Sequence, residues 1–478
     1  MKRVLFTHSY FYPLDAKQWK FKQPYPPLGT LQAAAVIREN DFEVSLFDVA
    51  LRNDPQSVKE ELSKTNPDFF VIYDDGFNYL TKMCLTVMRE AAFTMARLAK
   101  QKNATVIICS SDSSDHYEKY LNNGVDYVVC GEGEETLKEL LNSLSKNQST
   151  ENISGIAFLN KGKLTVNSTR PVLRDLDELP MPAWDLIDLE PYKKIWQKHH
   201  GYFSLNIATT RGCPYKCNWC AKPIYGNRYN SRSPQHVLNE IELLLKNFQP
   251  DHFWMCDDIF GLKPKWIEQF GEIVQSKKLQ FKYKIQSRVD LLSDETTVKA
   301  LARSGAETVW VGAESGSQKI LDAMEKGITV KEIKKATALL RNYKIRVAYF
   351  LQFGYSGETK EDIHSTLNMV LEQMPDEIGI SVSYPLPGTK FFENVKSHLK
   401  EKQNWTDSDD LAMMYRGTYS PAYYKLLHRY VHSRYRIQRG LHQLKERNVK
   451  LRSFVSLIYH APLSLIQAWR LNRLQHAQ

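Results

Sequence analysis

Short apolar runs alternate with amphipathic segments through the first 145 residues of the chain. Five of these runs have the length and the continuous apolar character of buried strands: residues 3–8, 43–49, 69–74, 105–111 and 126–133. Helical periodicity fills the intervals between them, for example at residues 28–39 and 87–100. Strands that alternate with helices of this length favour a doubly wound parallel sheet, covered by helices on both faces. We therefore predict an α/β domain over residues 1–145, with ligand-binding loops at the carboxyl ends of its strands.

Residues 146–200 break this alternation. The stretch 153–168 has alternating residues on two arms and a turn at Lys161-Gly162, which predicts a hairpin. Pro180 and Pro182 prevent a regular helix in the stretch that follows. We interpret residues 146–200 as a structured linker with a hairpin.

The alternation returns between residues 201 and 400. Six runs are candidate strands: residues 203–209, 252–258, 282–288, 308–314, 346–354 and 377–386. Helical segments separate them: residues 234–247, 294–303, 318–325, 331–343 and 359–373. Six such units predict a partial (β/α)6 TIM-type barrel, whose active site lies at the carboxyl ends of its strands.

The composition, 42% hydrophobic and 25% charged, is typical of a folded soluble protein. No apolar run approaches the roughly 18 residues that a membrane-spanning helix needs. The N-terminus lacks the apolar core and cleavage site of a secretory signal. Seven cysteines in 478 residues do not suggest a disulfide framework, and their odd number indicates free thiols or metal ligands. We therefore expect a cytoplasmic location.

Positive charge is concentrated in residues 401–478, which have no strand pattern and are predicted to be helical. The chain has a net charge of +10, and residues 411–478 alone hold twelve Lys or Arg against one acidic residue, Glu446. The rest of the chain is about neutral, so we expect no nucleic-acid partner. Two interpretations of this basic tail stay open. It caps the barrel with a solvated face, or it contacts an acidic protein or an anionic membrane, peripherally at the inner membrane face.

Three of the seven cysteines fall within eight residues, in the stretch "RGCPYKCNWC": Cys213, Cys217 and Cys220. Their spacing fits one face of a buried helix, but Gly212 and Pro214 favour a loop. A structural zinc site needs four ligands, and no partner pair follows this triplet. Three thiolates leave one iron of a four-iron cluster without a protein ligand, open to a substrate or cofactor.

This motif, with Trp219 before the last cysteine, resembles that of the radical S-adenosylmethionine (SAM) superfamily. The resemblance implies a 4Fe-4S cluster held by the three cysteines, with SAM bound to the free iron and cleaved to a hydrogen-abstracting radical. It also implies four cofactor-binding residues: Trp219, Asp258, Arg288 and Glu314. Three of them have an alternative, and an acidic residue such as Asp258 could be a helix cap or a surface group. Arg288 could pair with Asp290 or Asp294, and Glu314 could cap the helix predicted at 318–325.

The N-terminal segments "PPLGTLQAAAVIREN" and "NNGVDYVVCGEGEETLKELL" resemble a Rossmann-like cobalamin-binding domain. The class with both domains includes cobalamin-dependent radical SAM methylases and anaerobic Mg-protoporphyrin IX monomethyl ester cyclases. Six small residues are candidates for contacts to the corrin: Gly29, Thr30, Ser110, Ser111, Gly131 and Gly133. The alternative is a domain that kept the fold and lost the ligand. The Asp-x-His-x-x-Gly motif of cobalt-ligating domains is missing after the first strand, so we predict that neither His8 nor another protein histidine coordinates cobalt.

The resemblance predicts an enzyme that uses SAM and cobalamin to methylate an unactivated carbon of a small molecule. A membrane contact of the basic tail would suit a lipid-like substrate. A flavodoxin or ferredoxin would supply electrons. Oxidative cyclisation or ring rearrangement of a hydrophobic or tetrapyrrole-like substrate needs the same cofactors and stays open. A tRNA methylthiotransferase would use Cys84, Cys109 and Cys130 for a second cluster, but it also needs a cysteine near the end of the first strand, where none occurs. A non-catalytic cobalamin sensor would make the cysteine triplet superfluous.

Overall fold

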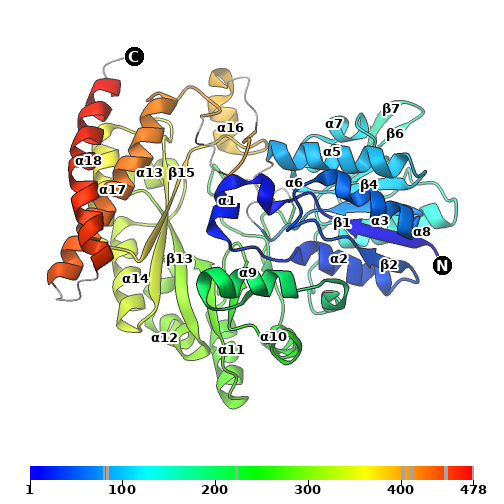
Figure 1. Cartoon of the computed structure of the whole chain (residues 1–478), viewed down its shortest axis with the longest axis horizontal. Coiled ribbons are helices and arrows are strands. Elements are labelled where there is room, and N and C mark those ends of the chain that lie inside the picture. Colours follow the sequence, from blue (N-terminus) through cyan, green and yellow to red (C-terminus); the bar gives the residue numbers. More distant parts are fainter. Residues whose placement is uncertain are drawn as a thin grey trace.

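The computed structural model describes residues 1–78, 81, 85–220, 224–399, 404–408, 411, 413–445 and 451–475. Within them the chain forms two main sheets, side by side, and a helical C-terminal layer (Figure 1). The predicted α/β fold class, with an N-terminal parallel sheet, a partial barrel and a helical C-terminus, is confirmed.

The first sheet has the strand order β2-β1-β3-β4-β5-β6-β7, and its first five strands are parallel. Its strands are β1 (Arg3–Thr7), β2 (Glu43–Leu46), β3 (Phe69–Tyr73), β4 (Thr105–Cys109), β5 (Tyr127–Val129), β6 (Ile156–Asn160) and β7 (Lys163–Val166). The helices of this domain are α1 (Ala16–Phe21), α2 (Leu28–Arg38), α3 (Val58–Thr65), α5 (Thr86–Lys100), α6 (Ser111–Asp115), α7 (Tyr117–Leu121) and α8 (Glu134–Ser145). Alternate residues of β1 face opposite cores: Val4 and Phe6 pack with α2 and α8, and Leu5 packs with α3 and α5. This is the doubly wound arrangement that the apolar runs predict.

The predicted hairpin forms, but it extends the N-terminal sheet. Strands β6 and β7 pair antiparallel around Lys161 and Gly162, which both have positive φ. β6 also pairs antiparallel with β5, with Tyr127 opposite Phe158. The sheet therefore continues past residue 145 into the segment that we interpreted as a linker. The hairpin covers the edge that β5 would otherwise expose.

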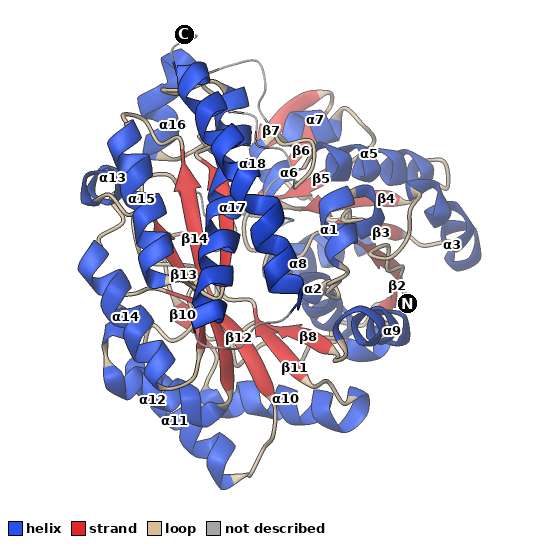
Figure 2. Cartoon of the chain, turned by 60° about the vertical axis from the view of Figure 1, so that its left-hand side comes forward, coloured by secondary structure: helices blue, strands red, loops and turns tan. Residues whose placement is uncertain are grey.

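The second sheet is a partial barrel of six parallel strands in the order β15-β14-β13-β12-β11-β8 (Figure 2). The strands are β8 (Ser204–Ile207), β11 (His252–Met255), β12 (Lys282–Ser287), β13 (Ala306–Glu314), β14 (Arg346–Phe353) and β15 (Glu377–Val382). The helices before, between and after them are α9 (Glu190–His200), α10 (Pro234–Phe248), α11 (Pro264–Ser276), α12 (Glu295–Ser304), α13 (Gln318–Ala323), α14 (Val330–Asn342), α15 (Lys360–Gln373) and α16 (Lys390–Val395). Short 3-10 turns complete the described elements: η1 (Tyr12–Leu14), η2 (Pro55–Ser57), η3 (Trp184–Leu186), η4 (Leu291–Ser293) and η5 (Lys396–His398).

Hydrogen bonds to the outer helices set which face of each barrel strand points inward. The hydroxyl group of Tyr283 in β12 lies 2.6 Å from that of Ser304 in α12, and the Tyr349 hydroxyl in β14 lies 2.5 Å from that of Thr337 in α14. Neighbouring strand residues point to the other face. Gln352 in β14 and Arg288, directly after β12, therefore reach the inner side or the upper rim of the barrel.

The C-terminal region ends in two long antiparallel helices, α17 (Pro421–Lys445) and α18 (Leu451–Gln475). α17 packs on α15, and α18 packs on α17 as the outermost layer (Figures 1 and 2). The N-terminal domain lies at the opposite edge of the molecule. No described helix combines the length and the apolar character that crossing a membrane requires.

Candidate functional site

The cysteine triplet lies in an irregular loop above the barrel, after β8. A two-stranded ladder of β9 (Thr210–Arg211) and β10 (Asn230–Ser231) closes the base of this loop. Gly212 has φ +78°, and a Cβ at this position would collide with the carbonyl oxygen of Arg228. Cys213 is buried, Cys217 and Cys220 are half-buried, and none of the three forms a disulfide with another described residue. Residues 212–217 are not helical, so the interpretation of the triplet as a buried helical stripe is wrong.

Two buried side chains anchor the loop to the barrel. The carboxylate of Asp257 accepts hydrogen bonds from Thr209 N (2.7 Å), Thr209 Oγ1 (2.6 Å) and Thr210 N (2.7 Å). Burial raises the pKa of Asp257 to about 6, although these bonds oppose the rise. Near the middle of the loop, Asn218 donates from N to Met324 O (3.1 Å) and from Nδ2 to Ala323 O (2.7 Å).

The donor set fits a cluster better than a single ion. Within the described residues, no three His, Cys, Asp or Glu side chains are gathered closely enough to hold one metal ion. Zinc would need four ligands around one centre. The ligands of a four-iron cluster bind different irons and stand farther apart, which three cysteines on one anchored loop can satisfy.

The guanidinium of Arg288, directly after β12, has one nitrogen atom without a hydrogen-bond partner among the described residues. Its guanidinium donates from Nε to Asp290 Oδ1 (3.0 Å) and from Nη2 to Asp290 Oδ2 (3.3 Å) and Gly327 O (3.2 Å). The guanidinium carbon lies 3.6 Å from the ring centroid of Tyr215, a residue of the cysteine loop. Nη1 is buried and has no hydrogen-bond partner among the described residues. The pairing with Asp290 is present, and it leaves the two N–H groups of Nη1 for an anionic group of a ligand.

Glu314 ends β13 in the left-handed region, with φ +54°. Its Oε1 accepts a 2.7 Å bond from Lys326 Nζ, and both side chains are buried. Burial acts to lower the pKa of Lys326, but the charge of Glu314 outweighs it and raises that pKa above its usual value. The N-cap position of α13 is Ser317, three residues after Glu314, so the alternative that Glu314 caps this helix is wrong.

Other buried polar atoms without described partners lie on the cysteine loop and at the ends of β14 and β15. They are Trp219 Nε1, Gln352 Oε1, Gln352 Nε2 and Ser383 Oγ. The Trp219 ring contacts Tyr384 edge-on with centroids 6.4 Å apart, and Lys326 Nζ lies 5.8 Å from the Trp219 centroid. An unsatisfied buried polar atom is costly, so this group indicates a polar ligand at the mouth of the barrel. The sequence pattern did not single out Lys326, Gln352 or Ser383. Gln352 and Ser383 lie two and three residues before the ends of predicted strands, which was a weak signal, and Lys326 directly follows a predicted helix.

Asp258, which we predicted to bind a cofactor, is exposed, while its neighbour Asp257 is buried in the loop anchor. A contact from Asp258 to a cofactor stays a prediction.

The candidate corrin residues gather at the carboxyl ends of β3, β4 and β5, and most have partners within the fold. Thr30 Oγ1 donates to Tyr73 O (2.6 Å), and Gly29 N donates to Asp75 Oδ1 (3.1 Å). A Cβ on Gly133 would lie 2.7 Å from Cys109 Sγ, so close packing requires this glycine.

The remaining candidates lie in the neighbouring turns. Ser110 forms a capping box with Ser113 at the start of α6, and Ser111 is buried in the first turn of that helix. Gly131 has φ +82°. The contacts of all six residues to a corrin stay predictions.

The other N-terminal side chains considered as ligands include His8 and Cys109. His8 has a partner within the fold, and Cys109 is a poor metal ligand. His8 Nε2 lies 2.9 Å from Asp48 Oδ1, and Asp48 also accepts a 2.6 Å bond from Tyr192. Burial and the charge of Glu134 raise the pKa of the Cys109 thiol well above its ordinary value, which opposes a ligand role. Cys84 lies outside the described residues.

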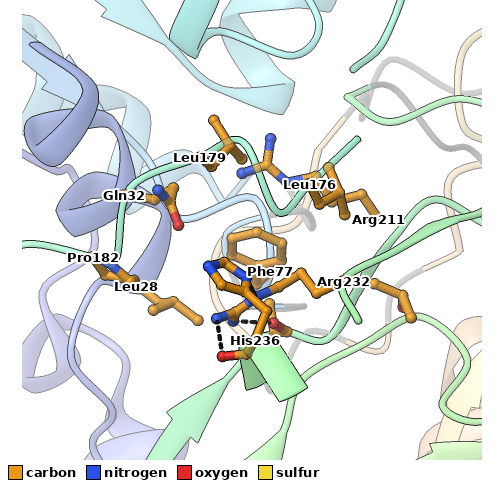
Figure 3. A pocket seen from close by; sticks show the side chains of 11 residues that line it. Leu28, Gln32, Phe77, Leu176, Leu179, Pro182, Arg211, Arg232 and His236 are labelled. Carbon is orange, nitrogen blue, oxygen red and sulfur yellow. Dashed lines mark hydrogen bonds between the residues drawn. The ribbon is translucent and has the colours of Figure 1, made fainter. Parts of the chain in front are cut away.

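Arg211 joins the two domains directly beside the cysteine loop. Its Nη1 bonds Glu132 Oε1 (2.5 Å) and its Nη2 bonds Glu134 Oε1 (2.8 Å), in the Gly-Glu-Gly-Glu turn after β5. All three side chains are at most 5% exposed. A pocket beside Arg211, lined also by Phe77 and Arg232 (Figure 3), encloses about 20 Å³, room for little more than one water molecule. It is therefore not a cofactor site.

Comparisons with known proteins match a family model to each of the two domains. Residues 207–370 match the Radical SAM superfamily, and residues 19–141 match the B12 binding domain. An uncharacterized methyltransferase of Pyrococcus horikoshii is 27% identical over 80% of this chain and 81% of its own. The anaerobic magnesium-protoporphyrin IX monomethyl ester cyclase of Rubrivivax gelatinosus is 25% identical over 82% of this chain and 70% of its own.

Two solved structures share the fold. The radical SAM methyltransferase TsrM from Kitasatospora setae, with cobalamin and a [4Fe-4S] cluster bound, has a TM-score of 0.68 at 19% identity, over 83% of this chain and 78% of its own. The cobalamin-dependent radical SAM enzyme OxsB, with aqua-cobalamin and SAM bound, has a TM-score of 0.76 at 16% identity, over 98% of this chain and 72% of its own.

Proposed function

We propose that this chain, a radical SAM enzyme with an N-terminal B12-binding domain, transfers a methyl group to an unactivated carbon of a small molecule. The observation that carries the proposal is the buried bridge from Arg211 to Glu132 and Glu134. The bridge holds the Gly-Glu-Gly-Glu turn after β5 of the B12-binding domain against Arg211, which stands two residues before Cys213. The two cofactor sites are therefore neighbours, as a reaction that uses both requires.

The residues of the chain have distinct tasks in this proposal. The cluster, SAM and cobalamin together supply an electron, a hydrogen-abstracting radical and a methyl group. The three cysteine thiolates hold the cluster and leave one iron open. The free Nη1 of Arg288 orients the carboxylate of SAM by a charge-assisted hydrogen bond. The rings of Trp219 and Tyr384 exclude water beside the reacting groups. His8 stays bonded to Asp48 and does not coordinate cobalt.

A second candidate reaction is oxidative cyclisation or ring rearrangement of a hydrophobic or tetrapyrrole-like substrate. The similarity to protoporphyrin ester cyclases supports it. Both reactions use the same cofactors, so they differ only in whether the methyl group of SAM reaches the product.

We also propose where the enzyme works and how its parts divide the task. A flavodoxin or ferredoxin supplies electrons in the cytoplasm, and the basic C-terminal region holds the enzyme at the inner membrane face, near a lipid-like substrate. Residues 1–145 bind cobalamin, and residues 201–400 carry the radical chemistry. Residues 146–200 link these two domains, and residues 401–478 contact the membrane.

The test uses holoenzyme purified and assayed without oxygen. It is incubated with a reductant, a cell extract as the source of substrate, and SAM that carries a deuterated methyl group. We expect 5′-deoxyadenosine, S-adenosylhomocysteine and a deuterium-labelled product. Without label transfer, 5′-deoxyadenosine would support the cyclisation alternative. If 5′-deoxyadenosine does not exceed the background of Cys217→Ala, both proposals are wrong.

A further inference from the structure

The outward face of α18 is an apolar stripe. Of the twelve large hydrophobic residues exposed in the described part of the chain, six lie on this helix of 25 residues. They are Val455, Ile458, Tyr459, Leu465, Ile466 and Trp469. At about 100° per residue, they cover a single stripe roughly 120° wide. Leu465 is 73% exposed and Ile458 is 61% exposed, so no described residue covers the stripe.

The opposite face of α18, which packs on α17, mixes apolar side chains such as Leu457 and Leu474 with polar ones. Its buried residues are His460, Ser464, Gln467 and Leu471. Nδ1 of His460 and Oε1 of Gln467 have no partner in the described part of the molecule. A helix that only capped the barrel would be polar on its outer face, whereas the outer face of α18 carries the apolar stripe. This orientation therefore indicates that the outer face meets an apolar phase.

The charge around the stripe identifies that phase. The sequences of α17 and α18 contain no Asp or Glu, and five arginines on them are exposed: Arg429, Arg436, Arg439, Arg470 and Arg473. Arg470 and Arg473 belong to α18 itself, whereas Arg436 contacts His460 and Arg439 donates to Asp376 O. The Arg473 guanidinium lies 4.8 Å from the ring centroid of Trp469, so basic and aromatic groups share one surface. Anionic headgroups would pair with these cations while the apolar side chains enter the acyl boundary. A second copy of this chain would instead bring its own positive charge.

We propose that α18 is an amphipathic anchor that lies flat on an anionic bilayer with its apolar stripe inserted. The proposal rests on the membrane contact in the proposed function and names the surface that makes it. Arg470, Arg473 and Pro462 interrupt the apolar sequence, so the helix lies in the interface and does not cross the bilayer. Because α18 is the outermost layer, this orientation points the N-terminal domain away from the bilayer (Figure 1).

The test measures binding of the full-length holoenzyme to vesicles of phosphatidylcholine with and without phosphatidylglycerol. Wild-type protein should sediment with the anionic vesicles and be partly released by salt. The double variant Ile458→Glu, Leu465→Glu should bind at least about tenfold more weakly, because the stripe can no longer insert. Leu159→Glu makes the same change at an apolar position that is 43% exposed on β6, and it should bind like wild type.

Insertion is checked with brominated lipids, which quench tryptophans at the acyl boundary. The quenching of wild-type protein should be largely lost in Trp469→Phe. Equal vesicle binding by the double variant and the wild type would overturn the proposal, as would the absence of wild-type binding. Self-association that the double variant abolishes, without vesicle binding, would make a second copy the occupant and also overturn it. Vesicle binding needs no turnover, so failure of methyl transfer would leave this result unaffected.

Discussion

Replacing Arg211 by methionine tests whether the buried bridge holds the two domains together. Methionine keeps most of the length of the side chain and removes the charge, so Glu132 and Glu134 lose their partner without a large cavity. Burial acts to lower the pKa of Arg211, but Glu134, Tyr225 and Glu132 outweigh it and raise that pKa well above its usual value. The guanidinium is therefore charged at any accessible pH.

The expected cost follows from this burial. Removing one partner of a buried ion pair typically destabilises a protein by about 3–5 kcal/mol, because the remaining charge stays unsolvated. The triple variant Arg211→Met, Glu132→Gln, Glu134→Gln leaves no unpaired charge, so most of that loss should be recovered. Arg38→Met is the control, since its pair with Asp185 is 40% and 66% exposed and is worth at most about 1 kcal/mol.

The cost should also depend on pH. Burial raises the pKa of Glu132, and the charge of Arg211 opposes that rise. Without Arg211 the folded-state pKa of this carboxyl rises further above its unfolded value. A carboxyl with a raised folded pKa destabilises the fold increasingly as pH rises from its unfolded pKa to its folded pKa. Arg211→Met should therefore approach wild-type stability in mild acid and lose most at alkaline pH.

The assay follows urea unfolding of anaerobic holoenzyme by circular dichroism and by cluster absorbance. Midpoints are compared between variants, because a protein with several domains and cofactors does not unfold in two states. We expect cluster absorbance to disappear earlier in Arg211→Met, since the bridge lies beside the cysteine loop. The reasoning is refuted if Arg211→Met is as mild as Arg38→Met, or if the triple variant is no more stable than the single one.

Three further outcomes follow from the site. Cys217→Ala should lose the bound iron and sulfide, whereas Cys130→Ala, a half-buried cysteine outside the loop, should keep both in an iron and sulfide assay of purified protein. Burial raises the pKa of Glu358 to about 8, so its protonated form is favoured in the fold, and the stability cost grows as pH rises from about 4.5 to 8. Glu358→Gln should remove that dependence. The melting temperature of the variant relative to wild type should therefore rise from mildly acidic to mildly alkaline pH. A difference in melting temperature that stays constant over this pH range would count against the prediction. Asp257→Asn replaces a charged acceptor of the hydrogen bonds from Thr209 and Thr210 by a neutral one. The free energy of unfolding should fall by about 1–3 kcal/mol, and the cluster occupancy of purified protein should also fall. Full occupancy would contradict the anchoring role of Asp257.

The sequence was sufficient wherever the signal is local. Apolar runs and helical periodicity predicted the strands of both sheets, because the period of side chains along one element depends only on that element. Gly212 and Pro214 predicted the loop that carries the cysteines, since backbone freedom and proline geometry act over one or two residues. Lys161-Gly162 predicted the hairpin for the same reason.

Only the tertiary structure decided the partners. The hairpin joins β5, and Lys326, Glu132 and Glu134 meet side chains 12 to 79 positions away in the sequence. Asp257 and Asp258 have the same chemistry, yet Asp257 is buried and hydrogen-bonded to Thr209 and Thr210, which lie 48 and 47 positions away in the sequence, and Asp258 is exposed. The sequence of α18 contains an apolar and a polar face, but its packing on α17 determines which face points outward. Periodicity defines the faces of an element, whereas the side of it that the rest of the chain covers depends on long-range packing.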